Sequence, residues 1–184
     1  MNKQISVKKQ KRKSTNLETL MDMLASKDGM IRQKARESLA IIGKPAVPSI
    51  IKLLQNSGLA QIRWEAAKIL GGIDDKRAIP SLVKALEDND HDVAWLAAEA
   101  LSKFKKAAWP ALLRLLIKSG SDSVLLRHGV HHVLKNQKEE GFNDLLATLK
   151  EALESKTLPE TATIAANDIL KRMKTELKKG GTNE

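Results

Sequence analysis

The chain has no cysteine and no tyrosine, and aromatic residues make up only 3% of its 184 residues. The lack of cysteine excludes disulfide bonds and thiolate metal sites. The scarcity of aromatic residues disfavours strands, which prefer aromatic and β-branched side chains. No apolar run is long enough to span a bilayer, and no signal-peptide pattern follows the N-terminus. We therefore expect a helical protein located in the cytoplasm.

The net charge of +10 is concentrated at the two ends of the chain. Residues 1–15 contain no acidic residue and six basic ones, Lys3, Lys8, Lys9, Lys11, Arg12 and Lys13. Residues 171–184 are also basic, so the part between them is close to neutral. We expect residues 1–15 and 178–184 to be disordered tails. The run Lys8, Lys9, Lys11, Arg12 and Lys13 is predicted to make nonspecific contacts with anions.

The chain repeats itself. The segments that begin at Ile31, Ile62 and Val93 share one pattern and start 31 residues apart, and weaker copies begin at Leu126 and Ala162. A second motif, with a proline early in it, precedes these copies and contains Pro48, Pro80 and Pro110. Proline is tolerated in the first turn of a helix because those N–H groups have no partner within the helix. The two motifs therefore alternate as the first and second helices of a repeated pair.

We expect an all-α fold of the α-solenoid class, a superhelix of about five helix pairs. The predicted repeat domain covers residues 16–177, with repeats at 17–42, 46–71, 76–104, 107–136 and 141–177. In each second helix the apolar residues are predicted to pack against neighbouring pairs. The small residues Ala66 and Ala97 should let the helices approach closely. Trp109 precedes a motif proline and is predicted to be a core residue.

The segment 62–71, followed by Asp75 and residues 78–82, resembles the short HEAT repeats found in the phycobilin lyase family. This resemblance implies that the second helices line a concave surface. It also implies that Arg32, Arg63 and Arg127 are structural residues that pair with aspartates in the turns. Their implied partners are Asp28, Asp90 or Asp122. The resemblance reaches no catalytic residue.

The third position of each copy is occupied in turn by Gln33, Trp64, Trp95, His128 and Ile164. Because equivalent positions on stacked helices share a face, Trp64 and Trp95 are predicted to lie about one helix spacing apart. Aromatic anchors flanked by charges are typical of peptide-binding surfaces. The predicted groove contains Gln33, Arg36, Trp64, Lys68, Trp95, Glu99, His128, His131 and Asn167. In the alternative interpretation, both indole rings only cover seams between helices.

These patterns predict a non-catalytic scaffold that binds a peptide or protein in its concave groove. No nucleophile–base set and no phosphate-binding loop is present, and neither a cofactor nor a metal is expected. The spacing of His128, His131 and His132 could hold a metal, but no acidic residue follows on the next turn. One alternative is a nucleic-acid binder, similar to HEAT-like DNA glycosylases, that uses the basic tail and the tryptophans. A second alternative is a protein that handles a chromophore, similar to the bilin lyases.

Overall fold

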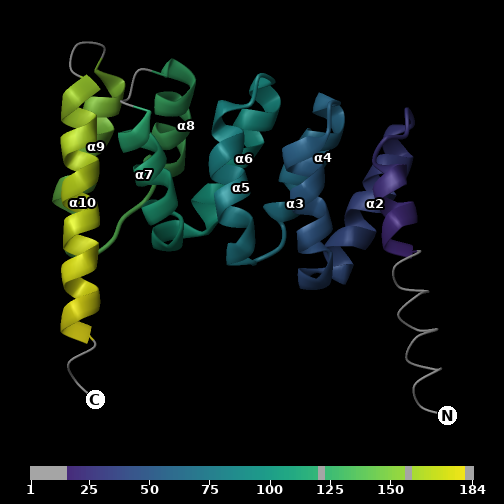
Figure 1. Ribbon diagram of the computed structural model, residues 1–184, viewed down its shortest axis with the longest axis horizontal. Helices are drawn as coiled ribbons and strands as arrows, with labels where there is room; N and C mark the ends of the chain where they lie inside the picture. Colours follow the sequence, from purple (N-terminus) through teal and green to yellow (C-terminus); the bar gives the residue numbers. More distant parts are fainter. Residues whose placement is uncertain (1–15, 120–122, 156–158, 181–184) are drawn as a thin grey trace. The chain divides into compact units, whose positions relative to one another are not determined.

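The computed structural model describes residues 16–119, 123–155 and 159–180, and within these ranges the secondary structure is helical. A first helix covers residues 16–23. The other α-helices are α2 (Gly29–Ile42), α3 (Val47–Asn56), α4 (Ala60–Leu70), α5 (Ile79–Lys84), α6 (His91–Lys103), α7 (Trp109–Lys118), α8 (Val124–Leu134), α9 (Asn143–Glu154) and α10 (Pro159–Gly180) (Figure 1). Short 3-10 helices occur at η1 (Lys44–Ala46), η2 (Lys76–Ala78), η3 (Ala85–Glu87) and η4 (Lys105–Ala107). Each predicted repeat, the fourth and fifth included, therefore contains both of its helices.

The helix boundaries follow from local chemistry. Asp28, Asp90 and Ser123 each precede a second helix and accept hydrogen bonds from its free N–H groups. Pro48 and Pro110 lie in the first turns of α3 and α7, as the sequence predicts. The three side-chain caps explain why α2, α6 and α8 begin within a few residues of the predicted positions.

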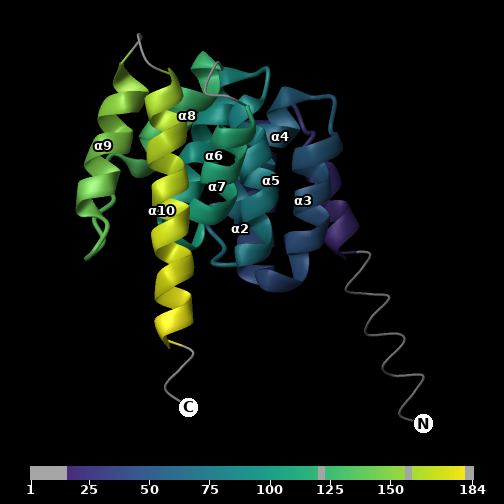
Figure 2. The ribbon, with the colours of Figure 1, turned by 60° about the vertical axis from the view of Figure 1, so that its left-hand side comes forward.

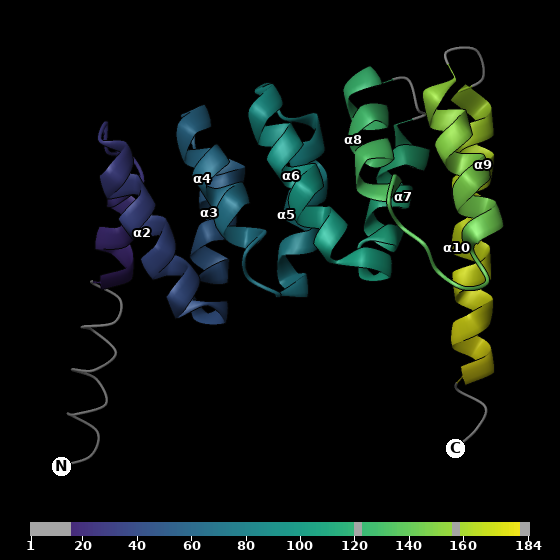
Figure 3. The same cartoon turned by 180° about the vertical axis from the view of Figure 1, so that it is seen from behind.

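The chain divides into two compact units, and the division falls between Ala78 and Ile79. It lies inside the third predicted repeat, 76–104, just before α5. In the first unit, α4 packs against both α2 and α3. In the second unit, α5 packs against α6 and α7, and α6 packs against α8 (Figure 3). Stacked pairs of this kind are what the repeat pattern predicts. Residues 1–15, a predicted tail, lie outside the described residues. Of the predicted tail 178–184, residues 178–180 are instead helical, as the end of α10, and residues 181–184 lie outside the described residues.

The core consists of small and branched aliphatic side chains. In α4 and α6 the predicted interior positions are buried, including Ala66, Leu70, Ala97 and Leu101, whereas Ile62 is only half-buried. Trp109 is 1% exposed, which confirms its predicted core position, and its ring meets the edge of the Phe142 ring.

The last repeat is built differently from the others. The helix α10 packs against α7 and α9, and α9 packs against α8, so α10 does not continue the layer formed by α6 and α8 (Figure 2). The connection before α9 contains Gly141, whose φ of 75° is readily available only to glycine. Arg172 on α10 pairs with Asp144 on α9 at 2.7 Å, and Lys106 pairs with Glu176 on α10 at 2.9 Å. The long connection and these ion pairs set the position of α10, and the repeat pattern does not predict it.

Hydrogen bonds between Asp75 and Arg77 stabilise the turn that leads into η2 in the first unit. The Asp75 carboxylate accepts hydrogen bonds from the Arg77 backbone N–H at 3.0 Å and from its guanidinium at 2.5 Å. Arg77 Nη2 also donates to the Lys44 carbonyl oxygen at 2.9 Å, which ties this turn to η1. The Arg77 side-chain hydrogen bond lowers the pKa of Asp75 from 3.8 to about 2.

Enlarging a buried seam alanine should destabilise the fold. Ala97 is fully buried, so Ala97→Leu is expected to overpack α6 and lower the free energy of unfolding by about 1–3 kcal/mol. Ala147 is exposed on α9, so Ala147→Leu should change it by less than about 0.5 kcal/mol. Urea unfolding of the two variants measures this difference, and equal stabilities would contradict the predicted close packing.

The Asp75–Arg77 ion pair should make the stability of the fold decrease at acid pH. Because the folded pKa of Asp75 lies below 3.8, the ionised carboxylate stabilises the fold above about pH 4. That stabilisation is lost as the pH falls toward 2. We expect Arg77→Ala to lower the Tm near neutral pH, and the gap to wild type to close between about pH 4 and pH 2. Lys76→Ala, at the exposed neighbouring position, should show no such convergence in thermal scans.

Candidate functional site

A buried carboxylate organises the surface of the first unit. Glu65 on α4 is only 2% exposed and forms ion pairs with two arginines of α2. Arg32 Nε lies 3.2 Å from Glu65 Oε1, and Arg36 Nη1 lies 2.5 Å from Glu65 Oε2. Gln61 adds a further hydrogen bond to the same carboxylate. A buried carboxylate requires such partners, since an unpaired charge in the interior is strongly disfavoured.

The predicted groove residue Trp64 lies beside this carboxylate and is half-buried. Lys68 Nζ is 4.5 Å from the centroid of its indole ring, and the Arg36 guanidinium is 5.9 Å from it. Both distances are in the range of cation–π interactions. The structure therefore brings together three of the predicted groove residues of the first unit, Arg36, Trp64 and Lys68. Gln33 instead donates to Glu37 on its own helix at 2.9 Å.

In the second unit, Trp95 is 56% exposed and is held from one side by His132. The two ring centroids are 4.0 Å apart with an interplanar angle of 55°. His132 is itself buried, and its Nε2 bonds to the Glu99 carboxylate. Lys135 Nζ lies 3.2 Å from His132 Nδ1 and 5.7 Å from the Trp95 ring centroid. We call Trp95, Glu99, His132 and Lys135 the Trp95 cluster.

Both ring nitrogens of His132 are therefore engaged. An ammonium group only donates hydrogen bonds, so His132 Nδ1 accepts a hydrogen bond from Lys135. The proton of the imidazole is then on Nε2, which donates a hydrogen bond to the Glu99 carboxylate. This arrangement orients the imidazole plane against the indole of Trp95. Trp95 and Glu99 were predicted from the sequence as groove residues, whereas the roles of His132 and Lys135 were not. The sequence does show that His132 and Lys135 lie three residues apart, which places their side chains side by side on one helix face.

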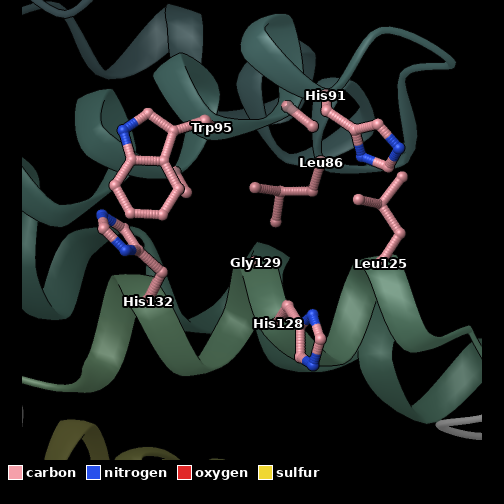
Figure 4. Close-up of a pocket in the computed structure, with 9 residues that line it drawn as sticks. Leu86, His91, Trp95, Leu125, His128, Gly129 and His132 are labelled. Carbon is pink, nitrogen blue, oxygen red and sulfur yellow. The ribbon is translucent and has the colours of Figure 1, made fainter.

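The Trp95 cluster borders a pocket of about 210 Å³ between α6 and α8 (Figure 4). Its lining residues come from η3, α6 and α8: Leu86, His91, Ala94, Trp95, Ala98, Leu125, His128, Gly129 and His132. Trp95 and His132 lie at one end, and His91 and Leu125 lie at the other. We refer to it as the α6–α8 pocket.

The three histidines of α8 do not converge. His131 Nε2 pairs with Glu154 on α9 at 2.8 Å, His132 pairs with Glu99, and His128 is exposed at the α6–α8 pocket. Among the described residues, no group of three or more potential ligands could hold a metal ion.

Of the remaining predicted groove residues, Asn167 lies on α10 and donates a hydrogen bond to the Thr163 carbonyl of its own helix. Its predicted place beside His128 and His131 is wrong, because α10 packs on α7 and α9.

The three motif arginines donate hydrogen bonds to backbone carbonyls. Arg32 donates to the carbonyls of Ser26 and Lys27, and Arg63 donates to the carbonyl of Ser57 at 2.9 Å. Arg127 reaches the carbonyls of Leu153 and Ser155 at the end of α9. The side chains of Asp28 and Asp90 are engaged at the N-termini of their own helices, and Asp122 lies outside the described residues. The structural role implied for the arginines agrees with these contacts, and the carboxylate that pairs with Arg32 is that of Glu65.

Two comparisons identify the class of protein. Residues 47–129 match the family model of HEAT repeats. A solved structure of the complex of CpcE and CpcF of phycocyanin lyase from Nostoc sp. is similar, with a TM-score of 0.59 and 23% sequence identity. The similarity covers 83% of this chain and 96% of that chain. A search of curated protein sequences gives no significant match. Residues 47–129 therefore match HEAT repeats, and the fold of the chain is an all-α solenoid of helix pairs that is similar to the lyase structure.

The comparison with the lyase corrects one expectation from the sequence. We expected a protein that is not an enzyme, but the fold that this chain shares over most of its length is also used in a lyase complex. The non-catalytic interpretation is therefore withdrawn. Neither comparison supports a nucleic-acid partner. In the described part of the chain, none of the helices combines the length and the apolar character needed to cross a bilayer.

The buried Glu65 should be important for the stability of the first unit. We expect Glu65→Gln to lower the free energy of unfolding by about 1–3 kcal/mol, because two arginines lose their ionic partner. The matched variant Glu37→Gln changes an exposed residue of α2 and should have an effect below about 0.5 kcal/mol. Chemical denaturation followed by circular dichroism measures both values. A Glu65→Gln variant as stable as wild type would show that the buried pairs contribute nothing.

Proposed function

We propose that this protein binds a protein partner through the face of α6 and α8 that carries Trp95. The observation that supports this most strongly is the state of that side chain. It is 56% exposed, yet it packs against an imidazole that is itself held at both nitrogens. A large apolar ring that stays exposed and oriented on a surface is typical of a binding anchor.

The physical advantage of this arrangement is preorganisation. A partner that orders a mobile side chain loses about 0.5–1.5 kcal/mol for each side chain that it immobilises. The Trp95 cluster removes much of that loss for the indole before binding. The adjacent α6–α8 pocket then offers a concave, largely apolar surface beside the ring. Anchor and pocket together are the arrangement found at the centre of protein interfaces.

The first unit supports the same function with a second aromatic surface. Trp64 is half-buried between Lys68 and Arg36, so its exposed part presents an aromatic ring flanked by cations. We include Arg36, Trp64 and Lys68 in the proposed binding residues. Gln33 and Asn167 are left out, because the side-chain amide of each donates a hydrogen bond within its own helix.

A role as one subunit of a lyase is a second candidate. The lyase structure to which this fold is similar is a complex of two proteins, which also favours a protein partner here. We infer that such activity would belong to an assembly with a second subunit. Incubating this chain and its captured partner with phycocyanin, and recording the visible absorbance spectrum of the chromophore, tests this second candidate.

Removing the anchor should abolish partner capture without unfolding the chain. We expect Trp95→Ala to reduce recovery of the specific partner at least about tenfold in a pull-down with nuclease-treated lysate. The control is Ile41→Ala, which removes an 87% exposed apolar side chain from α2. Circular dichroism should show unchanged helix content in both variants. Equal capture by wild type and Trp95→Ala at two salt concentrations would contradict the proposed function.

A further inference from the structure

We propose that the α6–α8 pocket receives an aromatic side chain of the partner that has a carboxylate beside it. This inference rests on the proposed function and adds the chemistry of the partner. The pocket has a volume of about 210 Å³. An engineered apolar cavity of about 150 Å³ is known to accept benzene, so the α6–α8 pocket has room for one aromatic ring.

The walls of the pocket suit an aromatic ring. Leu86, Ala94, Ala98 and Leu125 supply apolar surface, and the Trp95 indole closes one end. Gly129 faces Leu86 from α8, and a Cβ at this position would lie 3.1 Å from Leu86 Cδ2. Glycine therefore lets Leu86 lie directly against α8, where an added Cβ would displace the Leu86 side chain by a few tenths of an ångström. An incoming ring can pack against the indole at an offset or edge-on, which aromatic pairs prefer.

The polar groups of the pocket favour an acceptor or an anion. Its lining residues include His91, His128 and His132 and no carboxylate. The segment 124–135, which contains α8, has no acidic residue at all. Its basic residues are Arg127, His128, His131, His132 and Lys135. Among the described residues, His131 and His132 already have carboxylate partners, whereas His128 is exposed and forms no ion pair.

The acidic groups near the pocket show on which side the carboxylate belongs. Asp90 and Asp92 flank His91 in the sequence at the start of α6, so that end is unfavourable for another anion. Glu99 is engaged by His132 at the opposite end. The α8 side, with His128 at the rim and Lys135 near the indole, remains for an incoming carboxylate. The aromatic ring therefore enters beside Trp95, and its carboxylate faces His128.

Titration with 3-phenylpropionate tests this arrangement on the isolated full chain. Nuclear magnetic resonance should show saturable shifts of the Trp95 indole N–H and of the His128 imidazole, while the buried Trp109 signal stays fixed. The dissociation constant should be on the order of millimolar for so small a ligand. The uncharged 3-phenylpropanamide should bind about fivefold more weakly, and propionate, which has no ring, should not saturate.

Three variants separate the ring from the carboxylate. His128→Gln should remove the preference for the acid over the amide, whereas His131→Gln, one turn after His128 and outside the pocket, should keep it. Gly129→Ala should weaken both ligands by displacing the Leu86 side chain, which forms part of the pocket wall. Equal binding of acid and amide by the wild-type chain, or no saturable shift at Trp95, would overturn this inference.

Failure of the inferred pocket chemistry and failure of the proposed function give different results. If Trp95→Ala abolishes partner capture but 3-phenylpropionate does not bind, the inferred ligand chemistry is wrong and the binding face stands. If 3-phenylpropionate binds as expected but Trp95→Ala captures the partner normally, the pocket chemistry stands and the proposed function fails.

Discussion

The packing of small residues where helices meet is the constraint on which this structure depends. Each helix carries an apolar stripe that it cannot bury alone, so it must lie against a neighbouring helix. Fully buried alanines such as Ala66 and Ala97 let these helices approach closely. The same constraint leaves the third position of each second helix outside the core. That position is free to vary, and in this chain it holds Trp64 in one unit and Trp95 in the other.

The two tryptophans show how one motif position acquires two environments. Trp64 follows the repeat pattern of α4 and lies against cations near the buried Glu65. Trp95 occupies the same position of α6, but its neighbour is His132 from α8, which is held by Glu99 and Lys135. The local sequence of each helix is similar. The difference arises from residues about thirty positions away, which the stacking of repeats brings into contact.

Much of the fold follows from the sequence because its periodicity reports directly on burial. The alternation of two motifs predicts every helix from α2 to α10 within a few residues, and Trp109 lies in the core as predicted. The placement of α10 does not follow, because it depends on the connection around Gly141 and on ion pairs such as Arg172 with Asp144. The burial of Glu65 was also missed. A glutamate among charged residues suggests solvent exposure, and only the two arginines of the adjacent helix explain its position.

The proposed binding face requires Trp95 to be a fixed, exposed anchor and not a freely rotating surface side chain. The most direct measurement is the order parameter of its indole N–H bond from nuclear magnetic resonance relaxation, with buried Trp109 as the internal reference. If Trp95 is fixed, its order parameter should be near that of rigid backbone, about 0.85. In a His132→Ala variant it should fall below about 0.6, while the order parameter of Trp109 is unchanged. A low value for Trp95 in the wild-type chain would contradict a fixed anchor.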